Sequence, residues 1–313
     1  MTALKKVVIS GATGSIGMAL ISRLVKNNIE VLVLYRKDSL RVNRIPNHPL
    51  VRKEICSLAE MSDFELKSDD KYDAFYYFAW EGTFGNSRND MYLQNQNIKY
   101  TLDAVRLAKR LGCQTFIGAG SQAEYGRVEG KLTPDTAVFP ENGYGIAKLC
   151  AGKMSRILCE QLGVRHIWTR ILSVYGPMDN QNSLTMSTII KLMNGEQTHF
   201  TRGEQVWDFL YSEDAANAFY LLGEKGISGK TYCLGSGTAC LIKDAVMEII
   251  NQINPNVKTG IGDLPYPKNQ VMFLCADIER LTTDTGFVPM VSFKDGISKT
   301  IKWYKEKNIY EEN

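Results

Sequence analysis

The chain has 313 residues, of which 44% are hydrophobic and 23% charged, a balance typical of a soluble globular protein with a substantial core. Its net charge of +3 is too small to indicate nucleic-acid binding, and no apolar run approaches the length that spans a membrane. Seven scattered cysteines are expected to be buried free thiols in a reducing compartment, and with three distant histidines they predict no metal site. Because the first predicted strand comes within a few residues of Met1, we expect no signal peptide and a cytoplasmic protein.

A strand, a glycine-rich turn and a helix come first in the chain. Residues 5–10 form a short β-branched run, and residues 15–26 repeat apolar side chains at helical spacing. The N-terminus of a helix has free N–H groups and a partial positive charge, which stabilise a pyrophosphate. The alternative is an ordinary glycine-rich turn without a ligand. The pattern favours a dinucleotide-binding turn formed by Gly11, Thr13, Gly14, Ser15, Ile16 and Gly17.

The end of the next predicted strand, residues 30–34, indicates which dinucleotide the chain binds. Dinucleotide folds usually have an acidic residue there, about 20 residues past the glycines, that binds the ribose hydroxyls. This chain has Tyr35, Arg36 and Lys37 instead. Because an arginine pairs with a 2′-phosphate that a carboxylate would repel, Arg36 favours NADP(H) over NAD(H). The alternative is that these charges belong to a solvated loop.

Tyr144 and Lys148 are four residues apart at the start of a helix predicted at 147–162, so their side chains share one face. A free tyrosine has a pKa of about 10, and we expect the Lys148 ammonium and an oxidised nicotinamide to lower the pKa of Tyr144. Ser121 follows a strand predicted at 114–119, at the end where parallel sheets bind ligands. We predict that Tyr144 and Lys148 are catalytic, that Ser121 holds the substrate oxygen, and that Lys148 also bonds the nicotinamide ribose. A chance Tyr-x-x-x-Lys on a surface helix is the alternative.

Strands and helices alternate through about residue 165, which predicts a parallel sheet covered on both faces. We expect an α/β fold of the Rossmann type, with a doubly wound parallel sheet and a smaller C-terminal lobe. Residues 1–175 are predicted to form the dinucleotide-binding domain, which segments of the second half of the chain rejoin. Residues 176–313 are predicted to form mainly the substrate-binding lobe. Further helices are predicted at 97–111, 184–194 and 241–253, and loops at 176–184 and 201–207.

These motifs resemble the extended short-chain dehydrogenase/reductases, the group of nucleotide-sugar epimerases, dehydratases and 4-keto-sugar reductases. The resemblance covers nearly the whole chain. It implies that Glu54 lies near the adenine and that Asn97 takes the position of the family's structural asparagine; with Ala79, these two join the predicted cofactor-binding residues. Its further matches are residues 73–79, the Ser121–Gly126 segment, Arg170 with Tyr175-Gly176-Pro177, Trp207-Asp208-Phe209 with Asp214, residues 233–237, Ala276-Asp277 and Trp303-Tyr304.

Departures from the family pattern narrow the predicted reaction. Dehydratases of the family carry Asp-Glu directly after the serine or threonine, where this chain has Gln122 and Ala123, so the sequence argues against dehydration. The segment 121–126 is closer to that of 4-keto-6-deoxy-sugar reductases, and 79–82 resembles synthases of dideoxy sugars. Trp207 replaces a usual arginine, Ser173 a usual asparagine, and Lys268 stands in place of an Arg-x-Gly-Asp. The predicted substrate contacts are Trp80, Gln122, Ser173, Trp207 and Lys268.

The sequence therefore predicts an NADPH-dependent reductase of a nucleotide-activated 4-keto-6-deoxy sugar, with Tyr144 as the proton donor. One alternative is a nucleotide-sugar epimerase that keeps NAD tightly bound, because Ser121, Tyr144 and Lys148 serve both reactions. Another is a non-catalytic cofactor-sensing protein of the same fold, although such proteins usually lose the tyrosine or the lysine. Which sugar and which nucleotide are bound stays open. We expect His166 to be structural, and a homodimer formed through the helices at 97–111 and 147–162.

Overall fold

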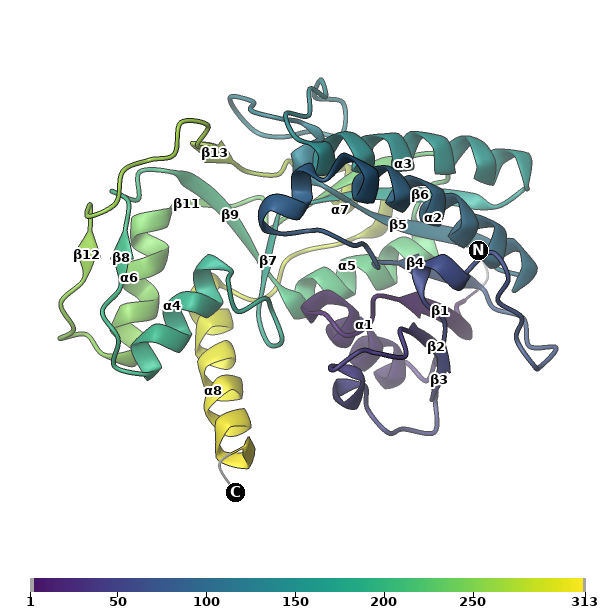
Figure 1. Cartoon of the computed structure of the whole chain (residues 1–313), viewed down its shortest axis with the longest axis horizontal. Helices are drawn as coiled ribbons and strands as arrows, with labels where there is room; N and C mark the ends of the chain where they lie inside the picture. Colours follow the sequence, from purple (N-terminus) through teal and green to yellow (C-terminus); the bar gives the residue numbers. More distant parts are fainter. Residues whose placement is uncertain (1–2, 312–313) are drawn as a thin grey trace.

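Seven parallel strands form the main sheet, in the order β10-β6-β5-β4-β1-β2-β3 (Figure 1). The computed structural model describes residues 3–311. The run from β3 to β6 is the order of a doubly wound dinucleotide-binding sheet, so the predicted Rossmann-type fold is confirmed. The strands are β1 (Lys6–Ser10), β2 (Glu30–Tyr35), β3 (Val51–Ile55), β4 (Ala74–Tyr77), β5 (Thr115–Ser121), β6 (Arg165–Ile171) and β10 (Thr231–Leu234).

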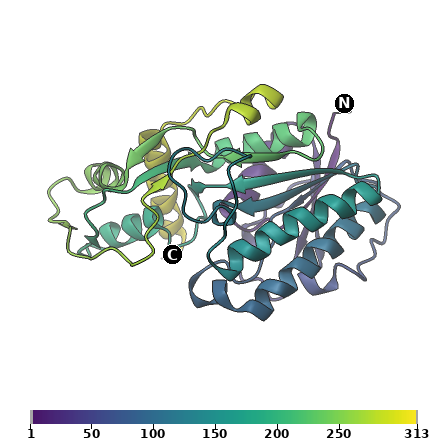
Figure 2. The ribbon, with the colours of Figure 1, turned by 90° about the horizontal axis from the view of Figure 1, so that it is seen from above.

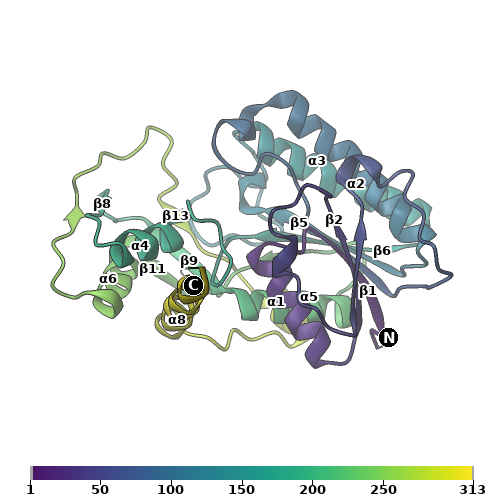
Figure 3. The same cartoon turned by 60° about the horizontal axis from the view of Figure 1, so that its bottom comes forward.

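Helices cover both faces of this sheet. Helices α1 (Ser15–Lys26) and α5 (Ser212–Lys225) lie on one face, and α2 (Met91–Arg110) and α3 (Gly143–Gln161) lie on the other (Figure 3). Because successive side chains of a strand point to opposite faces, β1 contributes to two cores. Val7 and Ile9 pack in the cluster that contains residues of α1 and α5, and Val8 packs in the cluster that contains residues of α2.

A smaller lobe is built mainly from the second half of the chain and lies beside one end of the sheet (Figure 2). Its core joins residues of α4 (Leu184–Met193), α6 (Ile242–Ile253) and α8 (Phe293–Glu311). Strand β9 pairs with β11, β13 and β7, and β12 pairs with β8. These short strands are β7 (Ser173–Tyr175), β8 (His199–Phe200), β9 (Val206–Tyr211), β11 (Ala239–Leu241), β12 (Gly260–Ile261) and β13 (Phe273–Leu274).

The second half also returns to the sheet, through α5 and through β10, which pairs with β6. Helix α7 (Glu279–Thr285) packs against α5 and β10. The division at residue 175 stays a prediction. The remaining elements are short 3-10 turns: η1 (Val42–Arg44), η2 (Leu58–Glu60), η3 (Gly85–Asn89) and η4 (Gln122–Glu124).

Two helices begin earlier than predicted, α2 at Met91 instead of residue 97 and α3 at Gly143 instead of residue 147. The carboxylate of Asp90 accepts a hydrogen bond from the backbone of Leu93 at 3.1 Å, and the Asn142 side chain accepts one from Gly145 at 2.9 Å. Such caps satisfy N–H groups that have no partner within the helix, so each helix starts before its apolar repeat becomes visible. Tyr144 and Lys148 therefore lie on consecutive turns of α3.

The cysteines are free, and five of the seven are buried. The expectation of buried thiols is wrong for Cys150, which is exposed on α3, and Cys240 is only half-buried. Within residues 3–311, His, Cys, Asp and Glu side chains form no group of three or more that could hold a metal ion. No helix in that part of the chain has both the length and the apolar character needed to cross a membrane.

Candidate active site

The glycine turn between β1 and α1 lets neighbouring backbone segments pack unusually close to it. Gly11 has a φ of +75°, and a Cβ there would lie 2.5 Å from the backbone nitrogen of Ala79. A Cβ at Gly17 would lie 2.6 Å from the Cα of Ala12, so only glycine lets α1 start this close to the turn. Gly14 faces open space instead, with nothing within 4 Å of a built Cβ.

The first turn of α1 fits the pyrophosphate of a dinucleotide. Gly14 is the N-cap residue and provides no capping side chain, and the first turn contains no acidic residue. The hydroxyls of Ser10 and Ser15 are buried without a hydrogen-bond partner, while Thr13 and Ile16 are partly exposed beside them. Because helix N–H groups without partners favour an anion, these residues match the dinucleotide-binding turn that the sequence predicts.

The other predicted cofactor residues lie at the ends of neighbouring strands. Arg36 follows β2, its side chain is 55% exposed, and its Nε lies 3.8 Å from the Asp38 carboxylate. Glu54 lies on β3 opposite Leu34 and accepts a hydrogen bond from Arg52 at 2.6 Å. These positions leave the Arg36 guanidinium accessible to a ligand at the carboxyl end of β2, whereas Glu54 already has a partner.

Asn97 has a structural role, and its side chain is not open to a cofactor. Its side chain is fully buried in α2. Its Oδ1 accepts a hydrogen bond from the Glu81 backbone at 3.0 Å, and its Nδ2 donates to the carbonyls of Glu81 and Leu93, both at 3.0 Å. The amide therefore fastens the loop after β4 to α2. This agrees with the structural position implied by the resemblance and leaves no polar atom of Asn97 free for a cofactor.

The structure brings the three predicted catalytic residues together. Tyr144 is buried, and the Ser121 side chain lies close enough to act on the ionisation of its phenol. The Lys148 ammonium donates to the Ala119 carbonyl at 2.6 Å and lies 5.8 Å from the centre of the Tyr144 ring. The Trp80 ring meets Tyr144 edge to face, with 6.1 Å between ring centres. This cluster stands at the carboxyl ends of β4 and β5, where ligands of such sheets bind.

The expected lowering of the pKa of Tyr144 by Lys148 is wrong. Burial of the phenol raises the pKa of Tyr144, while the Ser121 side chain and the charge of Arg88 oppose that rise. Burial also lowers the pKa of Lys148 to about 7, and the charge of Glu124 opposes that change. The prediction failed because a spacing of four residues fixes a shared helix face but says nothing about burial, which is the largest influence on both groups.

Sequence reasoning missed two polar residues at this cluster. The Arg88 guanidinium lies over the Tyr144 ring, 4.3 Å from its centre, and donates to the Thr83 carbonyl at 3.1 Å. The Gln94 side chain accepts a hydrogen bond from the Trp80 indole at 3.0 Å. Arg88 reaches the site because η3 docks on the start of α3, where Gly143 donates to the Asn89 side chain at 3.0 Å. That contact joins distant segments and has no sequence signal.

A cavity of about 550 Å³ is lined mainly by residues of the smaller lobe, together with Phe84 from the loop after β4. Two predicted substrate residues line it and bond each other: the Trp207 indole donates to the Ser173 hydroxyl at 2.5 Å. Lys268 is exposed on the loop before β13. That loop lines the cavity with Leu264 and Gln270 and not with Lys268. Gln122 is half-buried in η4 and does not line the cavity. The other lining side chains are mainly apolar or uncharged, and include Phe84, Leu184, Phe200, Phe209 and Ile242.

His166 is a buried structural residue, as expected. Its Nε2 shares a hydrogen bond with the Ser155 hydroxyl at 2.9 Å, and its ring stacks between Phe116 and Trp168. Burial lowers the pKa of His166 to about 3, so the ring is neutral near pH 7.

Comparisons with known proteins point to one family. The model of the NAD dependent epimerase/dehydratase family matches residues 7–235. A dTDP-glucose 4,6-dehydratase of Neisseria meningitidis is 23% identical, over 99% of this chain and 96% of its own length. A CDP-abequose synthase of Salmonella typhimurium is 26% identical, over 96% of this chain and 99% of its own length.

A solved structure has the same fold. The UDP-glucuronic acid 4-epimerase of Bacillus cereus, in complex with UDP-glucuronic acid and NAD, superposes with a TM-score of 0.83 at 21% identity and covers 96% of this chain and 99% of its own. The family match extends from β1 to β10 and so contains the glycine turn, Ser121, Tyr144 and Lys148. The chain belongs to the NAD-dependent epimerase/dehydratase family, that is, to the extended short-chain dehydrogenase/reductases, and is an enzyme of nucleotide-sugar metabolism.

Proposed function

We propose that this enzyme reduces the keto group of a nucleotide-activated 4-keto-6-deoxy sugar with NADPH. The observation that carries the proposal is the composition of the cluster around Tyr144. Ser121, Tyr144 and Lys148 are together, but the two residues after Ser121 are the amide Gln122 and the buried Ala123. Expelling water from a sugar needs an acid and a base, and these two positions provide neither. A ketone reduction needs one proton donor, which Tyr144 supplies.

The reaction adds a hydride and a proton across the carbonyl. When bound, the nicotinamide cofactor supplies the hydride for the keto carbon. Tyr144 gives its phenolic proton to the keto oxygen, and the Ser121 hydroxyl holds that oxygen by a hydrogen bond while it becomes the hydroxyl of the product. Lys148 carries its charge behind the phenol, and Trp80 keeps water away from both side chains.

The cavity in the smaller lobe suits a deoxygenated sugar on a nucleotide. Its side chains are mostly apolar or uncharged, and Trp207 and Ser173 bond each other in place of the arginine and asparagine that are usual in the family. Burial raises the pKa of Asp179, also in its wall, to about 6. The similarity to a CDP-abequose synthase along almost its whole length supports a dideoxy- or deoxy-sugar product over a fully hydroxylated one.

NADPH is the proposed hydride donor because the end of β2 bears a cation and no carboxylate. Tyr35 ends the strand and Arg36 follows it, with a largely exposed guanidinium. The nearby carboxylate of Asp38 is also exposed, at 79%, and is free to move away when a phosphate approaches. The epimerase of Bacillus cereus has NAD bound, so titration of this enzyme with both cofactors tests the choice directly.

A panel of nucleoside diphosphate 4-keto-6-deoxy sugars tests the proposal. Loss of NADPH absorbance, in a ratio of one NADPH to one sugar reduced, is the expected result. Tyr144→Phe provides the matched negative control, because it keeps the ring and removes only the proton donor. Conversion of a nucleotide sugar to its epimer without net consumption of NADPH would indicate the epimerase alternative. Binding of cofactor without turnover of any member of the panel would indicate a sensing protein.

A further inference from the structure

A buried carboxylate lies directly behind the predicted catalytic serine. Glu124 is only 1% exposed. Its Oε1 accepts hydrogen bonds from the backbone N–H of Ser121 at 2.9 Å and from the Trp168 indole at 3.0 Å. Its Oε2 accepts one from the Arg170 guanidinium at 2.8 Å. Three donors therefore hold one carboxylate in place, and the first of them is the backbone of Ser121.

Ser121 and Glu124 bond each other reciprocally at the start of η4. The Ser121 hydroxyl accepts from the backbone of Ala123 at 3.2 Å, while the Glu124 side chain accepts from the backbone of Ser121. This arrangement is a capping box, and the Ser-x-x-Glu spacing is its sequence signal. Because the box fixes both the backbone and the side chain of Ser121, it also fixes the direction in which the hydroxyl meets Tyr144.

The fold makes a specific space for the indole that holds Glu124. A Cβ at Gly118 would lie 2.3 Å from the Trp168 ring, and one at Gly120 would lie 2.3 Å from its Nε1. On the opposite side, a Cβ at Gly152 of α3 would lie 2.6 Å from the same ring. Three glycines on β5 and α3 thus form a slot for Trp168. An indole fixed in this way presents its N–H to Glu124 in one orientation.

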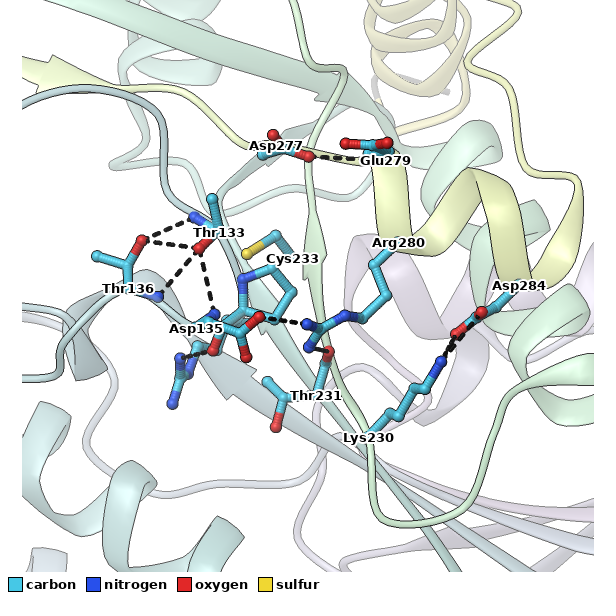
Figure 4. A network of polar contacts seen from close by, with 12 residues as sticks. Thr133, Asp135, Thr136, Lys230, Thr231, Cys233, Asp277, Glu279, Arg280 and Asp284 are labelled. Atoms are coloured by element: carbon cyan, nitrogen blue, oxygen red, sulfur yellow. Dashed lines mark hydrogen bonds and ion pairs between the residues drawn. The ribbon is translucent and has the colours of Figure 1, made fainter.

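Arg170 balances the charge of Glu124 and connects it to the loop that leads to Tyr144. Its guanidinium donates to the Pro134 carbonyl at 3.2 Å and lies 4.5 Å from the centre of the Tyr125 ring. Next to Pro134, the Asp135 carboxylate pairs with Arg280, whose guanidinium also donates to the Thr231 carbonyl of β10 (Figure 4). The loop that follows Glu124 is therefore fastened to β6 by Arg170 and to the edge strand β10 by Arg280.

From these contacts we infer that Glu124, held by Trp168 and Arg170, is the positioning residue that orients the Ser121 hydroxyl toward the substrate oxygen. The inference rests on the role given to Ser121 in the proposed function. Glu124 itself takes no proton in the reaction, because both of its oxygens already accept hydrogen bonds from the protein. A buried carboxylate with matched donors holds its geometry firmly, since a lost partner would leave a charge buried without compensation.

A double-mutant cycle tests whether Glu124 acts through Ser121. Glu124→Gln keeps the shape of the side chain and weakens its bonds to Ser121 and Arg170. We expect it to lower kcat about tenfold with KM nearly unchanged, and to have less than about a twofold effect when Ser121 is already Ala. The negative charge of Glu124 also acts on Tyr144 and Lys148. An effect through charge alone would persist in the Ser121→Ala background, so equal losses in both backgrounds would overturn the inference.

Two further variants keep the test decisive. Trp168→Phe removes the N–H donor and leaves an aromatic ring in the glycine slot. It should lower kcat by less than Glu124→Gln does, and its effect should likewise nearly disappear when Ser121 is already Ala. It takes the place of Glu124→Gln in the cycle if that variant does not fold. Glu141→Gln is the matched control, because Glu141 pairs with Arg127 in the same loop and both side chains are largely exposed. It should leave kcat unchanged. A loss in the control equal to that of Glu124→Gln would assign the effect to the loop in general.

A measurement without substrate separates this inference from the proposed function. Amide hydrogen exchange should rise about tenfold or more in a peptide covering residues 119–126 of Glu124→Gln, with α1 unchanged, because a neutral amide oxygen accepts from the Ser121 N–H more weakly than the carboxylate does. Unchanged exchange there would overturn the inference even if the wild type is a reductase. If the wild type instead interconverts epimers, the reductase proposal fails, and the same cycle is measured on that reaction.

Discussion

The Lys148 ammonium lies over the face of the Trp80 indole, with 3.8 Å between Nζ and the ring centre. The electron-rich face of an indole stabilises a cation, and here it does so for a lysine that is 3% exposed. The same indole meets the Tyr144 ring at an interplanar angle of 84°. Trp80 therefore contacts both members of the Tyr-Lys pair. From the sequence alone, a tryptophan at this position could equally have been a residue of the core.

Trp80→Ala should lower kcat about tenfold and destabilise the fold by only about 1 kcal/mol, because the indole is half-buried and its main partners are the catalytic side chains. Trp80→Phe keeps a ring beneath Lys148 and should recover most of the loss. Steady-state kinetics and thermal unfolding of both variants provide the measurement. A variant that melts far lower yet has normal kinetics when folded would remove Trp80 from the site.

Tyr144→Phe should lower kcat about a hundredfold or more while the affinity for cofactor is largely kept, because only the proton donor is lost. Burial raises the pKa of Tyr144 in the structure, so the phenol keeps its proton at neutral pH and can donate it. Tyr220→Phe is a suitable control, since Tyr220 lies on α5, on the other face of the sheet from Tyr144 (Figure 3). Single-turnover rates and cofactor titrations separate the two effects. Normal turnover of Tyr144→Phe would end the assignment of this residue.

Local rules predicted the elements that carry the cofactor turn. The glycine spacing and the apolar repeat placed α1 at Ser15–Lys26, and the structure agrees at both ends. Ser121 was predicted to follow a strand ending at residue 119 and is instead the last residue of β5, at the carboxyl end where parallel sheets bind ligands. Each of these inferences depends on one segment of chain, whose backbone geometry its own residues decide.

What escaped prediction depends on contacts between segments. Arg88 reaches Tyr144 only because η3 packs against the start of α3. Trp207 and Ser173 were predicted separately as substrate contacts, and their mutual hydrogen bond joins β9 to β7. Glu124 had a visible signal in the Ser-x-x-Glu spacing, but its indole and guanidinium partners come from β6, more than 40 residues further along the chain.

Arg36→Ala should weaken NADPH binding by about 1.5–3 kcal/mol and leave NADH binding nearly unchanged, because the lost interaction is a charge-assisted hydrogen bond to the 2′-phosphate. Fluorescence titration with each cofactor measures both affinities. Arg106→Ala, at an exposed position of α2, controls for a general change in charge. A wild type that prefers NADH, or an Arg36→Ala variant that loses both cofactors equally, would refute the role given to Arg36.

We propose a homodimer formed by α2 and α3. Both helices expose apolar side chains on their outer face: Ile146 and Ile157 are each 50% exposed, Met154 is 43% exposed and Tyr92 is 91% exposed. Leu158, which is also on α3, packs against the core of the main sheet instead. Two copies that pair these helices would cover the exposed residues.

Ile157→Glu should therefore convert the dimer to a monomer, because each interface would bury two carboxylates without partners. Size-exclusion chromatography with light scattering at micromolar concentration gives the mass directly. Leu40→Glu, which changes a leucine that is 98% exposed after β2, should leave the mass unchanged. A wild type that is already monomeric would refute the dimer, and an Ile157→Glu variant that stays dimeric would place the interface elsewhere.

Lys148 also predicts a pH dependence of stability. Burial lowers the pKa of Lys148 from 10.5 to about 7. Between these values the unfolded chain holds the proton that the folded chain has lost, so this residue makes stability rise with pH across that window. Below a pH of about 7 the fold contains a buried ammonium and the penalty is fully present. A side chain of similar shape without a charge should relieve it.

Lys148→Met should be more stable than the wild type by about 1–3 kcal/mol near pH 6, even though it is inactive, and this advantage should shrink as the pH rises toward about 10. Urea unfolding at a series of pH values measures the difference. Lys153→Met, at an exposed position one turn further along α3, should show no such trend. A constant difference at all pH values would mean that Lys148 keeps its charge in the folded protein, held by the Ala119 carbonyl and the Trp80 ring. In that case the same ammonium is available to the reaction over the whole pH range.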